Sequence, residues 1–159
     1  MRRLLLLCFC AAACVADPPV VPDPPKADMV YLLMADNLVP TESLEAQIEP
    51  RNKGKKNEES VHFVLGEHST AKTPLTSPVL VIKRGSLSPE ALQVFAFEVK
   101  NGRREVSFSK KKSPHPFTLT IVPTATESVF RMEVDQALPP GEYAVTPSGS
   151  EQVFCFAVY

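Results

Sequence analysis

The sequence predicts an all-β domain, an immunoglobulin-like or fibronectin-like antiparallel β-sandwich of about nine strands with at most one short helical turn. Short apolar or alternating segments recur at close spacing between turn residues, and no long amphipathic helical pattern competes with them. Near the C-terminus, LPPGEYAV has the pattern of a tyrosine corner, in which the ring packs into the core and the hydroxyl bonds to backbone upstream. Leu138, Gly141 and Tyr143 are therefore expected to be structural residues of that corner.

The first half of the chain supplies the early strands of this sandwich. MVYLLM at 29–34 is a continuous apolar run typical of a buried strand, whereas residues 44–49 alternate between aliphatic and polar side chains. Alternation returns at 61–65, and residues 79–82 form a further short apolar run. Between these last two, residues 67–78 are rich in serine, threonine and proline and are expected to form a long loop.

The second half begins with a helix start signal, Ser88 followed by Pro89, which allows one or two turns. Residues 94–100 and 103–109 flank Asn101-Gly102, which predicts a two-residue hairpin with a type I′ turn. Further strands are expected at residues 117–122, 129–134 and 152–159, because β-branched and aromatic residues dominate them.

The N-terminal residues predict export. Arg2 and Arg3 precede an apolar stretch and a small-residue cleavage site, so residues 1–16 read as a signal peptide. AAAC offers an alternative, a lipobox ending at Cys14, which would make that cysteine the lipidated first residue. Residues 17–27 are dense in proline and predict an extended tether, and residues 28–159 form the domain.

Charge limits the classes of binding partner that we expect, and the cysteine content limits disulfide formation. The formal net charge is −1, and loss of Arg2 and Arg3 with the signal makes it two units more negative. We therefore expect no nucleic-acid binding, and membrane contact only through a lipid anchor. Cys155 is the only cysteine beyond the signal region, so no intrachain disulfide is expected there. Its apolar neighbours predict a buried thiol.

Short segments also carry a resemblance. PPGEYAV followed by VFCFAV, an early VPTESLEAQIEPRNKG and a central VLGEHS resemble a family of exported bacterial single-domain proteins with no assigned activity. The resemblance implies a β-sandwich in the bacterial envelope, located in the periplasm or at the cell surface. It implies no mechanism.

The sequence contains no recognisable motif for catalysis or metal binding. His62, His68 and His115 have no zinc-like spacing, although Glu67, His68 and His115 could converge in a metal site built from loops. There is no G-x-S-x-G elbow and no glycine-rich phosphate loop. No cofactor and no enzymatic activity are expected.

The expected function is therefore a non-enzymatic binding or structural module that acts as a monomer on an envelope protein or a surface polymer. The loops that would carry it contain His68 in one segment and Lys110, Lys111, Lys112 and His115 in another. A second lysine cluster, at residues 53–56, could join the latter in a cationic patch. The alternatives are a small hydrolase with a loop-assembled site and an immunoglobulin-like protease inhibitor.

Overall fold

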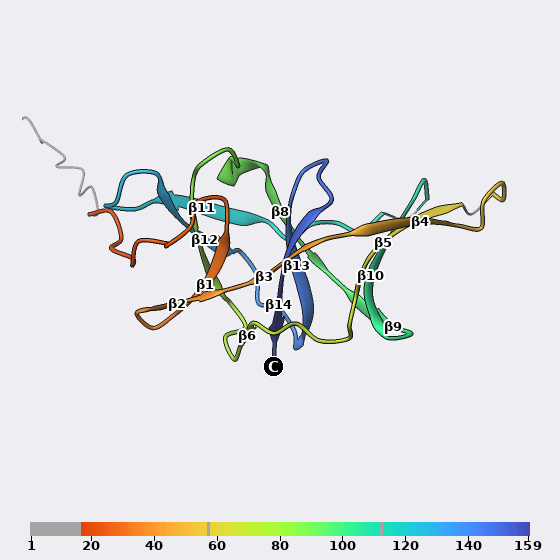
Figure 1. Cartoon of the computed structure of the whole chain (residues 1–159), viewed down its shortest axis with the longest axis horizontal. Helices are drawn as coiled ribbons and strands as arrows, with labels where there is room; N and C mark the ends of the chain where they lie inside the picture. The colour runs from red at the N-terminus through yellow and green to blue at the C-terminus, as the bar shows by residue number, and fades with distance from the viewer. Residues whose placement is uncertain (1–16, 57, 112) are drawn as a thin grey trace, which may run out of the picture.

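The computed structural model describes residues 17–56, 58–111 and 113–159. It confirms the all-β sandwich and the single short helical turn, which is the 3-10 turn at Pro89–Ala91. The expectation of about nine strands was wrong, because the described residues form 14 strands in three sheets. Figure 1 shows these sheets side by side along the long axis of the molecule.

Sheet A lies at the same end of the molecule as residue 17, the first residue that the structure describes (Figure 1). Its strands are antiparallel, and their spatial order is β11 (Leu119–Pro123), β12 (Val129–Val134), β7 (Val79–Lys83), β1 (Val30–Met34) and β2 (Asn37–Pro40).

Sheet B is the middle layer of the three. Its antiparallel strands follow the order β3 (Glu42–Glu45), β14 (Gln152–Val158), β13 (Gly141–Pro147) and β8 (Leu92–Ala96), and the short β6 (Lys72–Thr73) pairs in parallel with β14.

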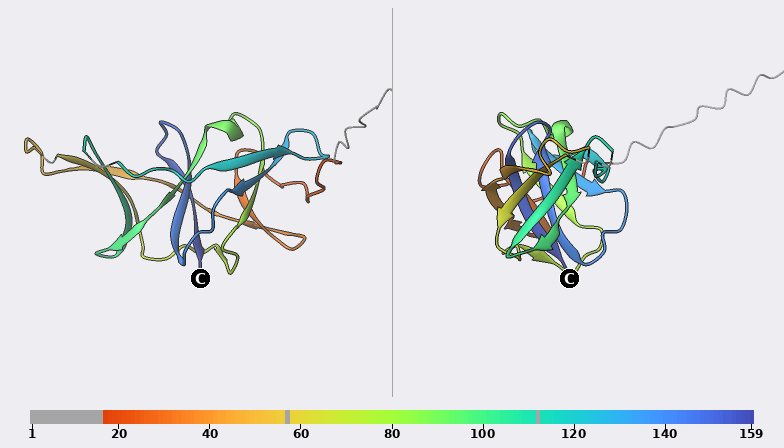
Figure 2. Two further views of the ribbon diagram at one scale, coloured as in Figure 1. Left: turned by 180° about the vertical axis from the view of Figure 1, so that it is seen from behind. Right: turned by 90° about the vertical axis from the view of Figure 1, so that its right-hand side faces the viewer.

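Sheet C lies on the opposite side of sheet B from sheet A, and the hairpin of β4 and β5 extends to the far end of the molecule (Figures 1 and 2). Its antiparallel strands follow the order β4 (Gln47–Arg51), β5 (Glu59–Leu65), β10 (Arg103–Ser109) and β9 (Glu98–Lys100).

Two of the expected strands each run through two sheets, which adds two strands, and β2 and β6 add two more where no strand was expected. The expected strand at 44–49 is divided at Ala46 into β3 of sheet B and β4 of sheet C. The expected strand at 94–100 is divided at Phe97 into β8 and β9 in the same way. Sheets B and C are thus joined at both edges, and their strands enclose a space in the manner of a flattened barrel.

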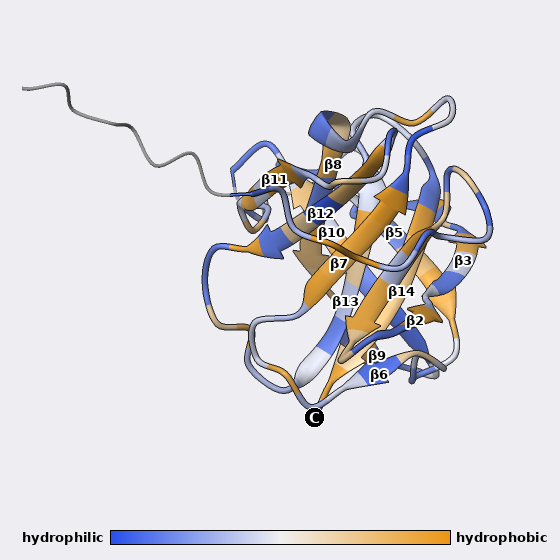
Figure 3. Cartoon of the chain, turned by 90° about the vertical axis from the view of Figure 1, so that its left-hand side faces the viewer, coloured by the Kyte–Doolittle hydropathy of each residue, from blue (hydrophilic) through white to orange (hydrophobic). Residues whose placement is uncertain are grey.

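The main core lies between sheets A and B. Alternate residues of β1, β7 and β12 face β13 and β14, and the buried side chains include Leu32, Ile82, Met132, Phe154 and Phe156. Figure 3 shows the apolar character of β7 and β14 from the sheet A end. A second, smaller core lies between sheets B and C, where the buried residues are small ones such as Ala46, Ala144 and Cys155. Sheet B is therefore buried on both faces.

The predicted hairpin is confirmed between β9 and β10. Lys100 pairs with Arg103, so that Asn101 and Gly102 alone form the turn. Both have positive φ angles, 52° and 77°, as a type I′ turn requires.

The proline-rich N-terminal segment lies against the outer face of sheet A. Val21 is buried in contact with Val81 and Val129, and Lys83 forms an ion pair with Asp23 at 3.0 Å. This packing adds the part of the segment around Val21 to the folded body. The predicted signal peptide, with Cys14, falls outside the described residues. Among the residues that are described, no helix has the length and apolar character to cross a membrane.

Candidate binding cavity

A cavity of about 340 Å³ lies between sheets B and C. Its walls are mainly apolar side chains that project from the facing strands of the two sheets. They comprise Ala46, Ile48, His62, Val106 and Phe108 on one side and Gln93, Phe95, Phe97, Ala144, Thr146 and Val153 on the other, together with Pro147 at the end of β13 and Gly149, Ser150 and Glu151 in the turn after it.

The cavity lies over β13, where the sheet B residue that faces sheet C is a small one. Along β13, Tyr143 and Val145 belong to the core with sheet A, whereas the alternate residue Ala144 faces sheet C. Since an alanine methyl group fills little of the space between two sheets about 10 Å apart, the interface remains partly empty.

Phe108 forms the aromatic contacts that close one wall of the cavity. Its ring meets the ring of Phe95 edge-on, with 5.7 Å between centroids, and so links sheet C to sheet B. The ring of His62 also packs edge-on against Phe108, at 4.9 Å. Burial lowers the pKa of His62 below its usual range, although the negative charge of Glu151 acts in the opposite direction. The imidazole is thus neutral at neutral pH, in keeping with an apolar wall.

The open end of the cavity continues into a groove with a cationic character. Ile48 and Phe108 line both spaces, and Ile48 is 47% exposed. The groove gathers four lysines from the two separate loops on either side of it, together with two glutamates: Lys55, Lys56, Lys110 and Lys111, with Glu58 and Glu59. The two lysine clusters noted in the sequence are thus brought together, with Lys112 outside the described residues.

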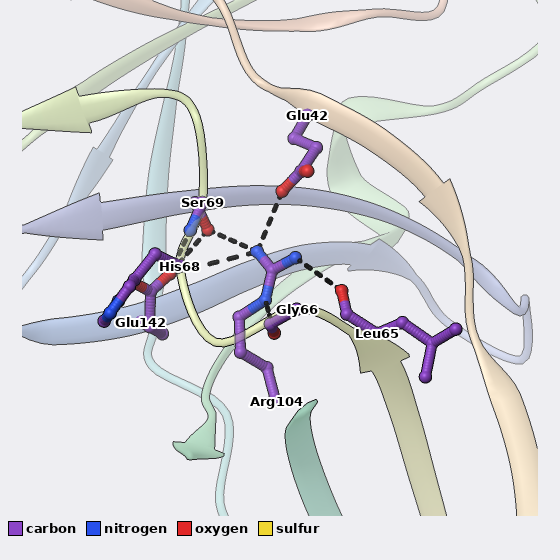
Figure 4. Close-up of polar contacts among 7 residues, drawn as sticks. All are labelled: Glu42, Leu65, Gly66, His68, Ser69, Arg104 and Glu142. Carbon is purple, nitrogen blue, oxygen red and sulfur yellow. Dashed lines mark hydrogen bonds and ion pairs between the residues drawn. The ribbon is translucent and has the colours of Figure 1, made fainter. Parts of the chain in front are cut away.

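The other end of the space between the sheets is closed by Arg104 of β10, whose side chain is 1% exposed (Figure 4). Its Nε donates to the carbonyl of Gly66 at 3.0 Å and its Nη2 to that of Leu65 at 3.3 Å. Its Nη1 donates to Glu42 at 2.8 Å and to the hydroxyl of Ser69 at 2.6 Å. Every nitrogen of the guanidinium therefore has an acceptor, and the group acts as a structural clamp between the sheets.

Glu142 of β13 completes this clamp from the sheet B side. It accepts hydrogen bonds from the backbone N–H of Ser69 at 2.9 Å and from its hydroxyl at 2.6 Å. His68 places Nδ1 at 3.3 Å from the same carboxylate, but the imidazole is 73% exposed. His68 thus lies beside the clamp at the closed end, away from the lysine groove.

The remaining residues singled out in the sequence have separate positions. His115 is exposed in the loop before Phe117 and does not line the cavity or the groove. Cys155 is fully buried in β14, which confirms the predicted burial of its thiol. Tyr143 donates its hydroxyl to the carbonyl of Pro139 at 2.6 Å and stacks on Phe156, while Leu138 is fully buried. Among the described residues, no three His, Cys, Asp or Glu side chains lie together as metal ligands would.

The sequence reasoning placed binding in loops and missed the cavity between the sheets. Ala46 and Ile48 were expected on the buried face of their strand, whereas His62 was expected on the face opposite Val61, Phe63 and Leu65. Alternation also does not reveal whether a facing sheet fills the space. The short side chains of Ala46 and Ala144 were the available signal. Arg104 was also missed, since its partners lie 35 to 62 residues away along the chain.

Comparisons of this chain with protein-family models, with curated proteins and with solved structures gave no match.

Proposed function

We propose that this protein is an exported, non-enzymatic binding module of the bacterial envelope that holds a small apolar group in the cavity between sheets B and C. The observation that carries the proposal is the apolar cavity itself, with a volume of about 340 Å³. Pockets for small ligands are mostly apolar and begin at roughly 300 Å³. The alternative partners, an envelope protein or a surface polymer, would instead contact the exposed loops.

The chemistry of the walls supports binding rather than catalysis. Aromatic and aliphatic side chains such as Phe95, Phe97 and Val106 offer dispersion contacts and exclude water from a bound apolar group. The polar groups within reach are few, and Thr146 already donates its hydroxyl to the carbonyl of Gln152 at 2.8 Å. Apolar burial is therefore the main source of affinity.

Binding can be tested with decanol, a neutral single-chain probe, in calorimetric titration. Val106 is half-buried and lines the cavity, so Val106→Phe should fill space that the probe needs and weaken binding by roughly tenfold or more. Val122→Phe makes the same change at a half-buried position of β11, outside the cavity, and should bind decanol as the unmodified protein does. Absence of decanol binding, or equal weakening by both variants, would contradict the proposal.

The hydrolase alternative has one observation in its favour. The hydroxyl of Ser60 lies 3.3 Å from Nε2 of His62, the order of distance expected of a nucleophile and its base. Within the described residues, no carboxylate is hydrogen-bonded to His62 to orient it. A fluorophosphonate probe should therefore leave Ser60 unlabelled, and labelling that is lost in Ser60→Ala would favour the hydrolase instead.

Export is proposed from the pattern of residues 1–16 and has its own test. Mass spectrometry of the N-terminus of the protein from its native source separates the two forms. Diacylglycerol on Cys14 would identify a lipoprotein, a free N-terminal Asp17 would identify simple cleavage, and an intact Met1 would contradict export.

A further inference from the structure

We infer that the ligand of this cavity is a single-chain amphiphile with an anionic headgroup, bound with its chain between sheets B and C and its headgroup beside the lysines of the groove. The inference rests on the proposed function, because it requires that the cavity accept an apolar group. It adds the chemical class of the ligand and its orientation.

The form of the cavity selects a chain that enters end-on. Both edges of the space are closed by continuous segments, β3 to β4 and β8 to β9, and the inner end is closed by Arg104 and its partners. The open end lies at Ile48 and Phe108, which also line the lysine groove. A chain inserted there leaves its polar end in the groove.

The size of the cavity favours one chain over two. Its volume of about 340 Å³ is near the lower limit for small-ligand pockets. A branched or two-chain lipid would leave a large part of its apolar surface in water. The 47% exposed side chain of Ile48 at the opening would be covered by the part of a single chain nearest the headgroup.

Charge at the open end selects an anion over a cation. Lys55, Lys56, Lys110 and Lys111 are exposed, and none of the four forms an ion pair within the part of the chain that the structure describes. Their ammonium groups are therefore available to a headgroup. Glu58 and Glu59 in the groove reduce the positive potential but leave it positive.

Glu151 opposes the lysines from the sheet B side of the opening and makes the charge distribution asymmetric. It lines the cavity and acts electrostatically on His62. An anionic headgroup should therefore lie on the sheet C side of the opening, next to the lysine loops. Removal of lysine charge should therefore weaken the binding of an anionic amphiphile, whereas removal of the charge of Glu151 should strengthen it.

The test compares three probes of equal chain length below their critical micelle concentrations at pH 8: decanoate, decanol and decyltrimethylammonium. The purified protein should bind decanoate more tightly than decyltrimethylammonium. Lys110→Gln/Lys111→Gln should lower the affinity for decanoate roughly fivefold and leave decanol unchanged, because surface charges a few ångströms from a headgroup contribute modestly in water. Glu151→Gln should raise the affinity for decanoate roughly twofold to fourfold.

The matched control is Lys26→Gln/Lys72→Gln, which removes the same charge from exposed lysines that line neither the cavity nor the groove. It should leave the ratio of decanoate to decanol affinity unchanged. Equal binding of decanoate and decyltrimethylammonium would overturn the inference, and so would an unchanged ratio of decanoate to decanol affinity in the Lys110→Gln/Lys111→Gln variant. In either case, binding of decanol would leave the proposed function standing. Failure of all three probes to bind would overturn both.

Discussion

Arg104 of sheet C and Glu142 of sheet B lie 3.9 Å apart, and the hydroxyl of Ser69 bonds to both. The hydroxyl donates its one proton to the carboxylate and accepts from the guanidinium, so each group is satisfied. Because both charged side chains are buried, their contribution to the stability of the fold depends on this complete set of partners. The clamp fixes the inner end of the cavity.

Arg104→Met should destabilise the fold by about 3 to 5 kcal/mol, since it leaves the carboxylate of Glu142 buried without its cation. Urea denaturation measures the change. Arg131→Met is the control, because Arg131 pairs with Glu133 in a partly exposed position and its loss should cost about 1 kcal/mol or less. Similar losses in the two variants would show that the Arg104 clamp is not a major source of stability.

Tyr143→Phe should lower the free energy of unfolding by about 1 to 2 kcal/mol, because it removes the donor to the carbonyl of Pro139 and leaves the ring in place. The comparison is Tyr159→Phe, at a side chain that is 69% exposed, where no change is expected. An unchanged denaturation midpoint for Tyr143→Phe would mean that the hydroxyl does not stabilise the corner.

Asp28 should make stability depend on acid pH. Desolvation would raise the pKa of its carboxyl, but hydrogen bonds from the backbone of Ser86 and Leu87, then from the Ser86 hydroxyl and the backbone of Gly85, together lower that pKa from 3.8 to about 2. The stabilisation is therefore present above pH 4 and is lost as the pH falls from about 4 to 2.

Asp28→Asn tests this dependence and retains a residue type that tolerates the positive φ of 57° at this position. The partly exposed carboxyl contributes about 1 to 2 kcal/mol after allowance for solvent screening. Thermal melts of the variant should show a smaller loss of stability between pH 4 and pH 2 than the unmodified protein. Parallel curves would assign the acid sensitivity to other carboxyl groups.

Cys155 should resist alkylation in the native protein. Burial raises the pKa of its thiol to about 12, with Arg104 lowering it and Glu42 and Glu142 raising it. Thiolate is therefore scarce at pH 8, and the side chain is also inaccessible. Peptide mapping after iodoacetamide treatment should find Cys155 unmodified without denaturant and fully modified in concentrated urea. Rapid native modification would indicate local opening of β14.

The sequence was sufficient to predict the elements that depend on local chemistry. Asn101-Gly102 determines its hairpin because both residues accept positive φ angles, and the apolar setting of Cys155 determines its burial. The sheet changes at Ala46 and Phe97 could not be predicted. Leu44, Ala46 and Ile48 keep facing inward as the segment leaves one sheet for the next, so the alternation is unbroken where the hydrogen-bonding partner changes.

The candidate cavity was hidden from sequence reasoning for a related reason. A void is a property of two surfaces, and neither Ala144 on β13 nor Val106 on β10 indicates what lies opposite it. The lysines were noticed as charge clusters, but their convergence depends on the pairing of β5 with β10, whose paired residues are at least 38 positions apart. Contacts of this range are outside the reach of local patterns.

The passage of one segment through β2, β3 and β4 has a consequence for how the molecule unfolds. Only Thr41 and Ala46 separate these strands, and each is buried. No flexible connection is therefore available along this path at which sheet A could melt while sheets B and C persist, so disruption of one sheet is transmitted directly to the next. We expect heat and denaturant to produce a single cooperative transition, in which the amide protons that bond β2 to β1, β3 to β14 and β4 to β5 exchange only when the whole domain opens.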